Sequence, residues 1–243
     1  MRNARNVEVC FTPSLLEGYT GLDSTVVVID IFRATSSICT AFSNGVKSLL
    51  PVATTEEAMS YKELGFLVAG ERDGLKLDFA DFGNSPYNFA RENIEGRSVV
   101  YTTTNGTSTI HQASRYHKTI IGSFLNAGAV VDYLAGQDRN ALLLCAGWKG
   151  RFNLEDTLCA GYIAKRLLGT GGFHTNCDSA HAAIDIWNFA EKNPRAYIEK
   201  AAHRKRLREK GLDDCIDFCL TIDYTSVVPV LVGNELVKLD KKT

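Results

Sequence analysis

The sequence predicts an α/β fold with a mostly parallel sheet, and two observations support this prediction. Short β-branched runs alternate along the chain with stretches of helical character, which is the pattern of an α/β sheet protein. Several of these runs are apolar at consecutive positions, as in Val26–Ile29. Strands show this pattern when helices cover both faces of the sheet. We therefore expect a layered fold with a buried sheet.

The expected strands and helices alternate as far as Leu168. We expect strands at Val7–Phe11, Thr25–Ile31, Leu49–Ala53, Phe66–Ala69, Ser98–Thr102, Thr119–Gly122 and Ala141–Cys145. We expect helices at Thr35–Ser43, Thr54–Leu64, Ser85–Glu92, Thr107–Arg115, Ala127–Leu134 and Leu154–Leu168. Capping signals support the first two helices, because Asn44-Gly45 suits a helix end and acidic residues fill the first turn after Thr54.

The character of the chain changes at the glycine-rich break Gly169–Gly172. The stretch 173–223 has mainly helical character, and Pro194 suits the start of a helix that runs to about Lys210. Val227–Val232 and Glu235–Leu239 flank a Gly-Asn turn and predict a β-hairpin. We expect one α/β domain over residues 1–243, with two subdomains and a helical stretch at 173–223 as the alternative division.

Composition and charge exclude several classes of protein. The 243 residues are 45% hydrophobic and 23% charged, so the chain can bury enough apolar surface to fold. With 27 Lys and Arg against 28 Asp and Glu, it has no general electrostatic footprint for nucleic acid or an anionic membrane. Met1–Cys10 has no apolar signal segment, no apolar run approaches the ~20 residues that span a bilayer, and seven cysteines favour reduced thiols. We expect a cytoplasmic protein with no membrane or nucleic-acid partner.

Polar residues gather where the expected strands end, which is where parallel α/β sheets bind ligands. One set suits anions through guanidinium groups, hydroxyls and N–H groups at helix starts: Arg33, Arg72, Ser85, Thr103, Thr104 and Thr107. The other set consists of carboxylates: Asp30, Glu71, Asp81, Glu155 and Asp156. Carboxylate oxygens together with a phosphate ester suit Mg²⁺. The two sets predict metal-assisted chemistry on a phosphorylated or multiply anionic small molecule.

Each of these residues also has a purely structural interpretation. Asp30 interrupts an apolar strand, where a buried carboxylate is costly unless it is paired or metal-bound, and the alternative is a structural pair with Arg33 or Arg72. Asn84-Ser85-Pro86 is also an ordinary helix start, Thr102–Thr104 are also plain strand residues, and acidic residues such as Glu155-Asp156 stabilise a helix dipole. Their coincidence at successive strand ends favours function.

Other motifs are absent or have ordinary interpretations. The sequence has no Walker A loop, no Gly-x-Gly-x-x-Gly after a strand and no Gly-x-Ser-x-Gly elbow. His174, Cys177 and His181 lack an obvious fourth zinc ligand. Cys215 and Cys219 suit small core positions on a helix. The basic run His203–Arg206 with Arg208 suits a solvated helix face, although one or two of its side chains would reach an anionic ligand if the helix folded over the site.

Several segments together resemble the 2-phosphosulfolactate phosphatases. They are Val26–Thr35, Gly70–Arg72, Asp81–Pro86, Thr102–Thr107, Cys145–Gly147 with Leu154–Asp156, Ala202–Leu207, Gly211, Asp223 and Val228-Pro229. The resemblance covers nearly the whole chain. It implies a three-layer α/β/α architecture built from two similar halves. It also implies a Mg²⁺-dependent hydrolase that releases phosphate from 2-phospho-3-sulfolactate, a step of coenzyme M biosynthesis.

We therefore expect a Mg²⁺-dependent phosphatase that acts on a small anionic phosphate ester. The expected metal ligands are Asp30 and Asp156, and the expected catalytic residues are Asp30, Glu71 and Glu155. The expected substrate-binding residues are Arg33, Arg72, Asn84, Ser85, Thr103, Thr104, Asn105, Gly106 and Thr107. The alternatives are a phosphatase for another 2-hydroxy acid phosphate, such as phospholactate or phosphoglycolate, and a non-catalytic anion-binding protein. A homodimer is the default assembly for such an enzyme.

Overall fold

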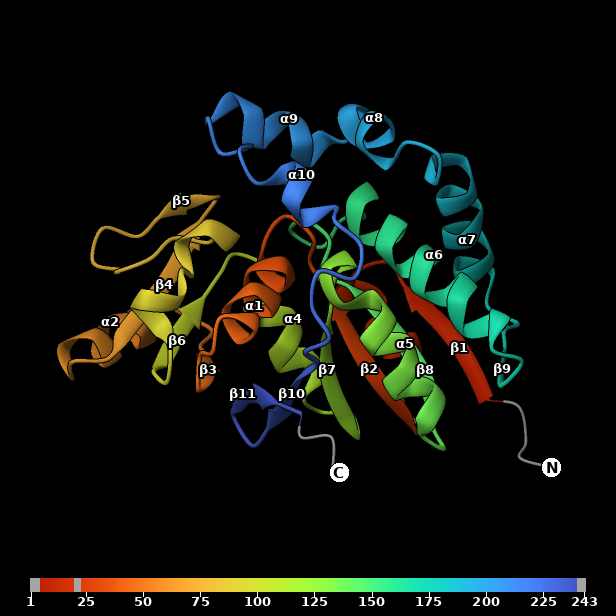
Figure 1. Ribbon diagram of the computed structural model, residues 1–243, viewed down its shortest axis with the longest axis horizontal. Coiled ribbons are helices and arrows are strands. Elements are labelled where there is room, and N and C mark those ends of the chain that lie inside the picture. Colours follow the sequence, from red (N-terminus) through yellow and green to blue (C-terminus); the bar gives the residue numbers. More distant parts are fainter. Residues whose placement is uncertain (1–4, 20–22, 240–243) are drawn as a thin grey trace.

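The computed structural model describes residues 5–19 and 23–239, and these form one mixed sheet with helices on both sides (Figure 1). The strands are β1 (Arg5–Cys10), β2 (Ser24–Ile29), β3 (Ser48–Pro51), β4 (Leu67–Arg72), β5 (Leu75–Lys76), β6 (Ser98–Thr102), β7 (Lys118–Gly122), β8 (Asn140–Cys145), β9 (Phe173–His174), β10 (Pro229–Val232) and β11 (Glu235–Lys238). Their order is β5-β4-β6-β3-β11-β10-β7-β2-β8-β1-β9. Most neighbouring pairs are parallel, so the predicted α/β class is confirmed.

The sheet consists of two parallel blocks separated by a hairpin. The β3 block contains β3, β4 and β6, and the β2 block contains β1, β2, β7 and β8. The predicted hairpin is confirmed as β10 and β11, and it lies between the blocks because β11 pairs antiparallel with β3 while β10 pairs antiparallel with β7. The hairpin turn uses Gly233 at a φ of 62°, which suits glycine.

Three hydrophobic clusters bind the layers together. The helices and 3₁₀ turns are η1 (Pro13–Tyr19), α1 (Ala34–Ser43), α2 (Thr55–Glu63), η2 (Pro86–Asn88), α3 (Arg91–Ile94), α4 (Gly106–Ala113), η3 (Phe124–Asn126), α5 (Ala127–Gly136), α6 (Leu154–Gly169), α7 (Asp178–Ala190), α8 (Pro194–Tyr197), η4 (Ile198–Lys200), α9 (Ala202–Glu209) and α10 (Ile216–Cys219). One cluster contains residues of α1, α4 and both strand blocks. A second packs α5, α6 and α7 on the β2 block, and a third packs α2 on the β3 block.

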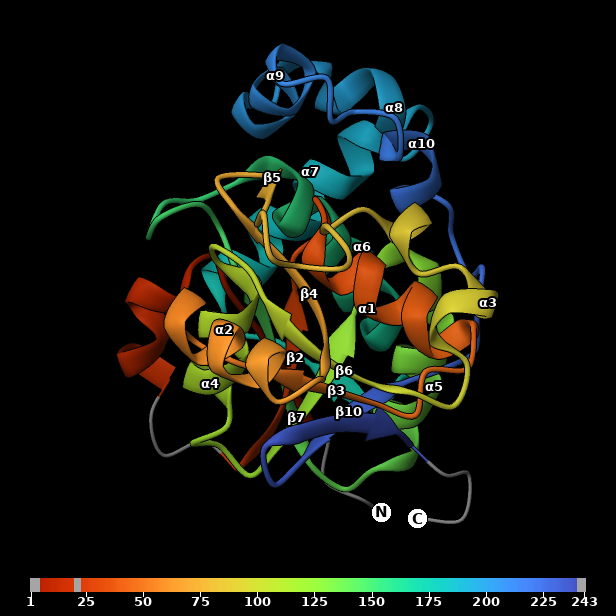
Figure 2. The same ribbon diagram turned by 90° about the vertical axis from the view of Figure 1, so that its left-hand side faces the viewer.

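The central cluster explains how strand ends from both blocks reach one site. Val28 of β2 and Tyr101 of β6 belong to it together with Ile38 of α1 and Ile110 of α4. Both blocks therefore pack on the same two helices. Figure 2 shows α9 and α10 lying above the sheet. The N-terminal ends of α1 and α4 are thereby held side by side at one end of the sheet, as the contacts of Gly106 described below show.

The predicted helix Ser85–Glu92 is wrong. The structure has the short turn η2, a break and the short helix α3 instead. The Asn88 side chain accepts the Ser85 N–H at 3.2 Å and closes the first turn. Phe89 is fully buried against Phe82 and Tyr101. This packing turns the chain out of the helical path, and Ala90 is extended with ψ near 144°.

The predicted helix from Pro194 to Lys210 is divided. It consists of α8, η4 and α9, with Ala201 extended at a ψ of 133° between the last two. Ile198 and Ala201 are buried at this break, and the new direction of α9 buries His203 and Leu207. Residues 173–223 are otherwise mainly helical, as expected.

Two further expectations concern the chain's surroundings. Among the described residues, no helix is both long enough and apolar enough to cross a membrane. The expectation for Met1–Cys10 partly concerns residues 1–4, which lie outside the described part of the chain.

Cys215 and Cys219 are fully buried in the core, which confirms the prediction that they occupy small core positions.

Candidate active site

Residues at the ends of three strands meet at a small cavity, which we call the inner cavity. It has a volume of about 20 Å³ and is lined by Asp30, Phe32, Arg33, Glu71, Gly74, Asn84, Asn105, Trp148, His203 and Leu207. Asp30 follows β2, Glu71 lies in β4, and Asn105 precedes α4 after β6. His203 and Leu207 come from α9, which covers the cavity. The structure therefore brings together Asp30, Arg33, Glu71, Asn84 and Asn105 from the predicted site.

Asp30 is the acid at the floor of the inner cavity. It is 7% exposed. Its Oδ1 accepts the Ala34 N–H at the start of α1 (3.3 Å), whereas Oδ2 accepts no hydrogen bond from the described residues. The pKa of Asp30 is raised to about 6, mainly by burial and in smaller part by the charges of Glu71 and Glu155, against the lowering effect of His203 and of the Ala34 N–H. The carboxylate is thus held with one oxygen open to a ligand.

Glu71 connects two loops of the site. Its Oε1 accepts the Thr104 N–H at 2.7 Å, and its Oε2 accepts the Thr104 hydroxyl at 3.0 Å and the Gly74 N–H. It is 5% exposed. These neutral donors satisfy a buried carboxylate without an ion pair. Glu71 therefore fixes the turn after β4 to the loop after β6.

The two predicted arginines have different surroundings. Arg33 is 4% exposed, lines the inner cavity and donates to the Gly74 carbonyl at 3.1 Å. Among the described residues this is the one hydrogen bond of its guanidinium, so most of its five N–H donors are available to a ligand in the cavity that Asp30 also lines. Arg72 instead donates to the Thr102 hydroxyl at 2.8 Å and to the Glu71 carbonyl at 2.7 Å, and it lies outside the residues that line the inner cavity. The geometry therefore makes Arg33 the better placed of the two to bind an anion.

The threonine-rich loop is largely bonded to itself. The Thr103 hydroxyl accepts the Thr107 N–H at 3.1 Å, and the Thr107 hydroxyl accepts the Thr103 N–H at 3.2 Å. This reciprocal pair caps the start of α4. Asn105 lines the inner cavity, and its Oδ1 accepts the Lys149 N–H at 3.0 Å. The hydroxyls of Thr103 and Thr107 thus shape the loop, while the Asn105 side chain faces the cavity.

Gly106 allows the starts of α1 and α4 to approach each other. A Cβ at this position would lie 2.5 Å from Ala34 Cβ, 3.0 Å from Asp30 Oδ2 and 3.2 Å from Thr103 Oγ1. The first distance is shorter than a carbon–carbon contact allows. Two helix N-termini therefore point at the region of Asp30, which favours an anion there.

Replacing Gly106 by alanine is expected to lower the free energy of unfolding by about 1–3 kcal/mol, because the new methyl group forces α1 and α4 apart. Chemical denaturation would measure this loss. Gly136→Ala is the matched control, because nothing lies within 4 Å of its added Cβ and alanine favours a helix. Equal stability of the two variants would contradict the close approach described here.

The neighbouring acids of α6 have separate partners. Asp156 is fully buried, with Oδ1 accepting the Ile31 N–H at 2.8 Å and Oδ2 accepting the Gly147 N–H at 3.1 Å. Burial, together with the charges of Asp30 and Glu155, raises the pKa of Asp156 well above its usual range. Because both its oxygens bind backbone N–H groups, Asp156 holds the loops after β2 and β8 in place beneath the site.

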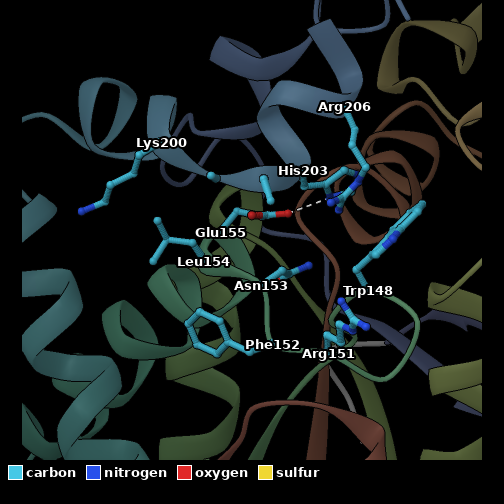
Figure 3. Close-up of a pocket in the computed structure, with 11 residues that line it drawn as sticks. Trp148, Arg151, Phe152, Asn153, Leu154, Glu155, Lys200, His203 and Arg206 are labelled. Atoms are coloured by element: carbon cyan, nitrogen blue, oxygen red, sulfur yellow. Dashed lines mark hydrogen bonds and ion pairs between the residues drawn. The ribbon is translucent and has the colours of Figure 1, made fainter. Parts of the chain in front are cut away.

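Glu155 forms a buried pair with His203. The Glu155 Oε1 atom lies 2.7 Å from His203 Nδ1, and the His203 ring packs near Trp148 and Phe32. Figure 3 shows this pair at the meeting point of α6 and α9. His203 lines both the inner cavity and the larger one described next, and among the described residues no hydrogen bond involves its other ring nitrogen, Nε2. In the sequence His203 stands out only as part of a basic run, and no motif marks Trp148.

A larger cavity adjoins this pair, and we call it the outer cavity. It has a volume of about 560 Å³. Trp148 and His203 line both cavities, and Glu155, Arg151, Lys200 and Arg206 line the outer one (Figure 3). The basic run has therefore folded over the site, the condition under which its side chains were expected to reach an anionic ligand.

A third cavity, of about 460 Å³, contains the predicted residue Ser85 and shares Arg33, Gly74 and Asn84 with the inner cavity. Asp81 also lines it. The Asp81 carboxylate is bound to Lys62 at 2.6 Å and to the Val68 N–H at 2.8 Å, which lowers its pKa. These bonds give Asp81 a structural anchoring role.

The carboxylates of the site meet the needs of a metal ion only in part. In the described ranges, no group of three or more His, Cys, Asp or Glu is arranged to hold a metal. Mg²⁺ commonly takes only one or two carboxylates and completes its shell with water and substrate phosphate. The open Oδ2 of Asp30 fits that requirement, whereas both oxygens of Asp156 are already bonded.

The chain is similar in sequence to one family of known proteins. Residues 10–234 match the family model described as 2-phosphosulpholactate phosphatase. A protein of Thermotoga maritima named "Probable 2-phosphosulfolactate phosphatase" is 45% identical over 218 residues, covering 88% of this chain and 91% of that protein. Proteins with the same name from Caldanaerobacter subterraneus and Clostridium acetobutylicum are 36% and 34% identical, covering 86% and 88% of this chain and 88% and 92% of their own lengths. The chain therefore belongs to the 2-phosphosulpholactate phosphatase family.

Proposed function

We propose that this phosphoric monoester hydrolase removes phosphate from 2-phospho-3-sulfolactate, with Mg²⁺ as its cofactor, and that it works in the cytoplasm in a pathway toward coenzyme M. Family membership supports a phosphatase, and the names of the relatives supply the substrate. The observation that carries the chemistry is the inner cavity, where the open oxygen of Asp30 lies beside the guanidinium of Arg33 and two helix N-termini.

The proposed roles follow from these positions. Mg²⁺, when bound beside Asp30, would polarise the phosphoryl group and lower the pKa of a bound water. Arg33 and the N-termini of α1 and α4 would bind the phosphoryl oxygens and stabilise the charge that develops on them. Asn105 and Asn84 would supply neutral donors. Asp30 serves either as the nucleophile or as the metal ligand, and both roles need its ionised form.

The Glu155–His203 pair is placed to supply the proton that the reaction requires. When the bond between phosphorus and the ester oxygen breaks, that oxygen needs a proton to become the 2-hydroxyl group of the product. The phosphorus receives the oxygen of water. His203 lines the inner cavity, and Glu155 binds its Nδ1 and leaves Nε2 to act on the substrate, so we assign His203 as general acid and Glu155 as its positioning residue.

The test is phosphate release from 2-phosphosulfolactate and from phospholactate, each measured with Mg²⁺ and again with EDTA. The proposal predicts release that needs Mg²⁺ and is faster for the sulfonated ester, because a site built for an anion loses affinity when that anion is missing. Equal rates for the two esters would contradict the assignment of 2-phosphosulfolactate as the substrate, while the phosphatase activity would still be supported. Release that persists in EDTA would contradict the role of Mg²⁺. No release by the folded protein would favour an anion-binding protein.

A further inference from the structure

The outer cavity is lined by a cation, Arg206, that forms no ion pair within the described part of the chain. The Arg206 side chain extends from α9 and lies over the Trp148 ring, with its guanidinium carbon 4.3 Å from the ring centre. Its Nε atom is buried without a hydrogen-bond partner in the described structure. Burial lowers the pKa of the Arg206 guanidinium, against the opposing effect of the Glu155 charge. A buried donor without an acceptor is costly. An anion bound in the outer cavity would accept this hydrogen bond and remove that cost.

The neighbouring arginines of α9 have acidic partners, in contrast to Arg206. Arg204 lies 2.6 Å from an Asp213 oxygen and 3.3 Å from a Glu199 oxygen, and Arg208 pairs with Glu199. Within the described ranges, no ion pair involves Arg206. Acids outside α9 therefore neutralise Arg204 and Arg208. Arg206, which lies between them in the same helix and over the cavity, is left available.

Two other cations around the site, Lys200 and Lys76, are engaged elsewhere, whereas Arg151 also lines the outer cavity and has no ion pair among the described residues. The Lys200 ammonium lies 3.7 Å from the centre of the Tyr197 ring, and Figure 3 shows its side chain directed away from His203. In the third cavity, Lys76 donates to the Ala80 carbonyl at 2.8 Å. In Figure 3, by contrast, Arg206 extends from α9 toward His203 and Trp148. Since these two residues line both cavities, Arg206 is the cation best placed to reach a ligand that extends from one cavity into the other.

The volumes of the two cavities determine which part of such a ligand lies in each. About 20 Å³ of free space accepts only a few atoms, so only the reacting end of a substrate fits beside Asp30. The carbon chain and its other charged group must lie outside, and the outer cavity of about 560 Å³ has ample room for them. Arginine binds a group with several anionic oxygens through paired hydrogen bonds.

We propose that Arg206 binds the sulfonate group of the substrate in the outer cavity and that it thereby determines the preference for a sulfonated 2-hydroxy acid phosphate. This inference rests on the proposed function, because it assigns one group of that substrate. Arg33 then binds the phosphoryl end, and Trp148 orients the Arg206 guanidinium by stacking against it.

The experiment compares 2-phosphosulfolactate with phospholactate, which carries a methyl group in place of the sulfonate-bearing carbon. We expect Arg206→Gln to lower kcat/KM for 2-phosphosulfolactate by about tenfold to a hundredfold, as for a lost charged hydrogen bond. The value for phospholactate should change less than about threefold. Arg206→Lys keeps the charge without the paired donors and should fall between. Lys205→Gln, which removes an exposed cation of the same helix, should leave both values unchanged.

A binding measurement makes the inference independent of turnover. Calorimetric titration with sulfolactate and with lactate should show sulfolactate binding that is tighter than lactate binding in the unaltered protein, and this difference should disappear in Arg206→Gln. Equal losses on both phosphate esters would overturn the inference, because Arg206 would then serve a shared group or simply pair with Glu155. Unchanged kinetics would overturn it as well. If the unaltered protein hydrolyses neither ester, the proposed function fails, and the titration alone decides the role of Arg206.

Discussion

Asp30→Asn is expected to lower the rate of phosphate release from 2-phosphosulfolactate on the order of 1,000-fold, the size of effect seen when one preorganised electrostatic group is removed from an active site. Asparagine retains an oxygen to accept the Ala34 N–H but carries no charge. It can neither attack phosphorus nor contribute negative charge to a Mg²⁺ site. Steady-state release of phosphate at saturating Mg²⁺ measures the loss. Activity close to that of the unaltered enzyme would remove Asp30 from the mechanism.

The same substitution is expected to stabilise the protein when EDTA is present. Burial raises the pKa of Asp30 from an ordinary value of 3.8 to about 6, so the folded state disfavours the ionised form. The resulting destabilisation is small below pH 4, grows between about pH 4 and 6, and is fully present above pH 6. Asp30→Asn should therefore raise the melting temperature by a few degrees at pH 8 and by less at pH 4.5.

Melting curves of the two proteins at both pH values provide the check. A variant that is less stable than the original protein at pH 8 would contradict this account of Asp30. Asp81→Asn is the matched control, since the pKa of Asp81 is lowered by Lys62 and the Val68 N–H. The ionised form of such a group stabilises the folded protein, which is the opposite of the effect of Asp30. Replacing Asp81 should therefore destabilise the protein above pH 4.

His203→Asn is expected to reduce turnover of 2-phosphosulfolactate by about 100- to 10,000-fold, the usual range for loss of a general acid. Asparagine keeps an N–H donor near the Nδ1 position that bonds Glu155 but has nothing at the position of Nε2. The departing alkoxide would then leave without a proton. Phosphate release by the purified variant, shown to be folded by its melting curve, measures the effect.

The dependence on the leaving group separates proton donation from a structural role. With 4-nitrophenyl phosphate the departing oxygen is stable without a proton, so the loss caused by His203→Asn should be far smaller than with the sulfolactate ester. Equal losses with both esters would show that His203 only supports the fold. Glu155→Gln should give an intermediate loss, because the amide still accepts the hydrogen bond from His203 but contributes no negative charge.

The strands were the most predictable part of the fold. Runs such as Val26–Ile29 are apolar on both faces and could only suit a covered strand. Helices near the site were less predictable, because long-range packing decided them. Phe89 leaves the helical path to pack on Tyr101, and Ala201 breaks the later helix so that α9 can bury His203 and Leu207.

The sequence was enough to predict several of the residues that line the inner cavity, but it did not predict how they are arranged and bonded. The rule that ligands bind beyond strand ends selected Asp30, Arg33, Asn84 and Asn105, which do line the inner cavity. It could not show that Arg72 bonds Thr102 or that Thr103 and Thr107 cap α4, because such bonds depend on tertiary positions. His203 could be found only by knowing that a distant helix covers the cavity. Its place in a segment similar to the family was the one available signal.

The hairpin in the middle of the sheet has a consequence for how the chain assembles. β10 and β11 follow every other described strand in the sequence, yet they pair with β7 and β3 and close the gap between the two blocks. Until residues 229–238 have been synthesised, each block carries an unpaired edge of the kind that promotes aggregation. Completion of the sheet must therefore be a late, long-range event during biosynthesis, and folding should be slow for a protein of this size.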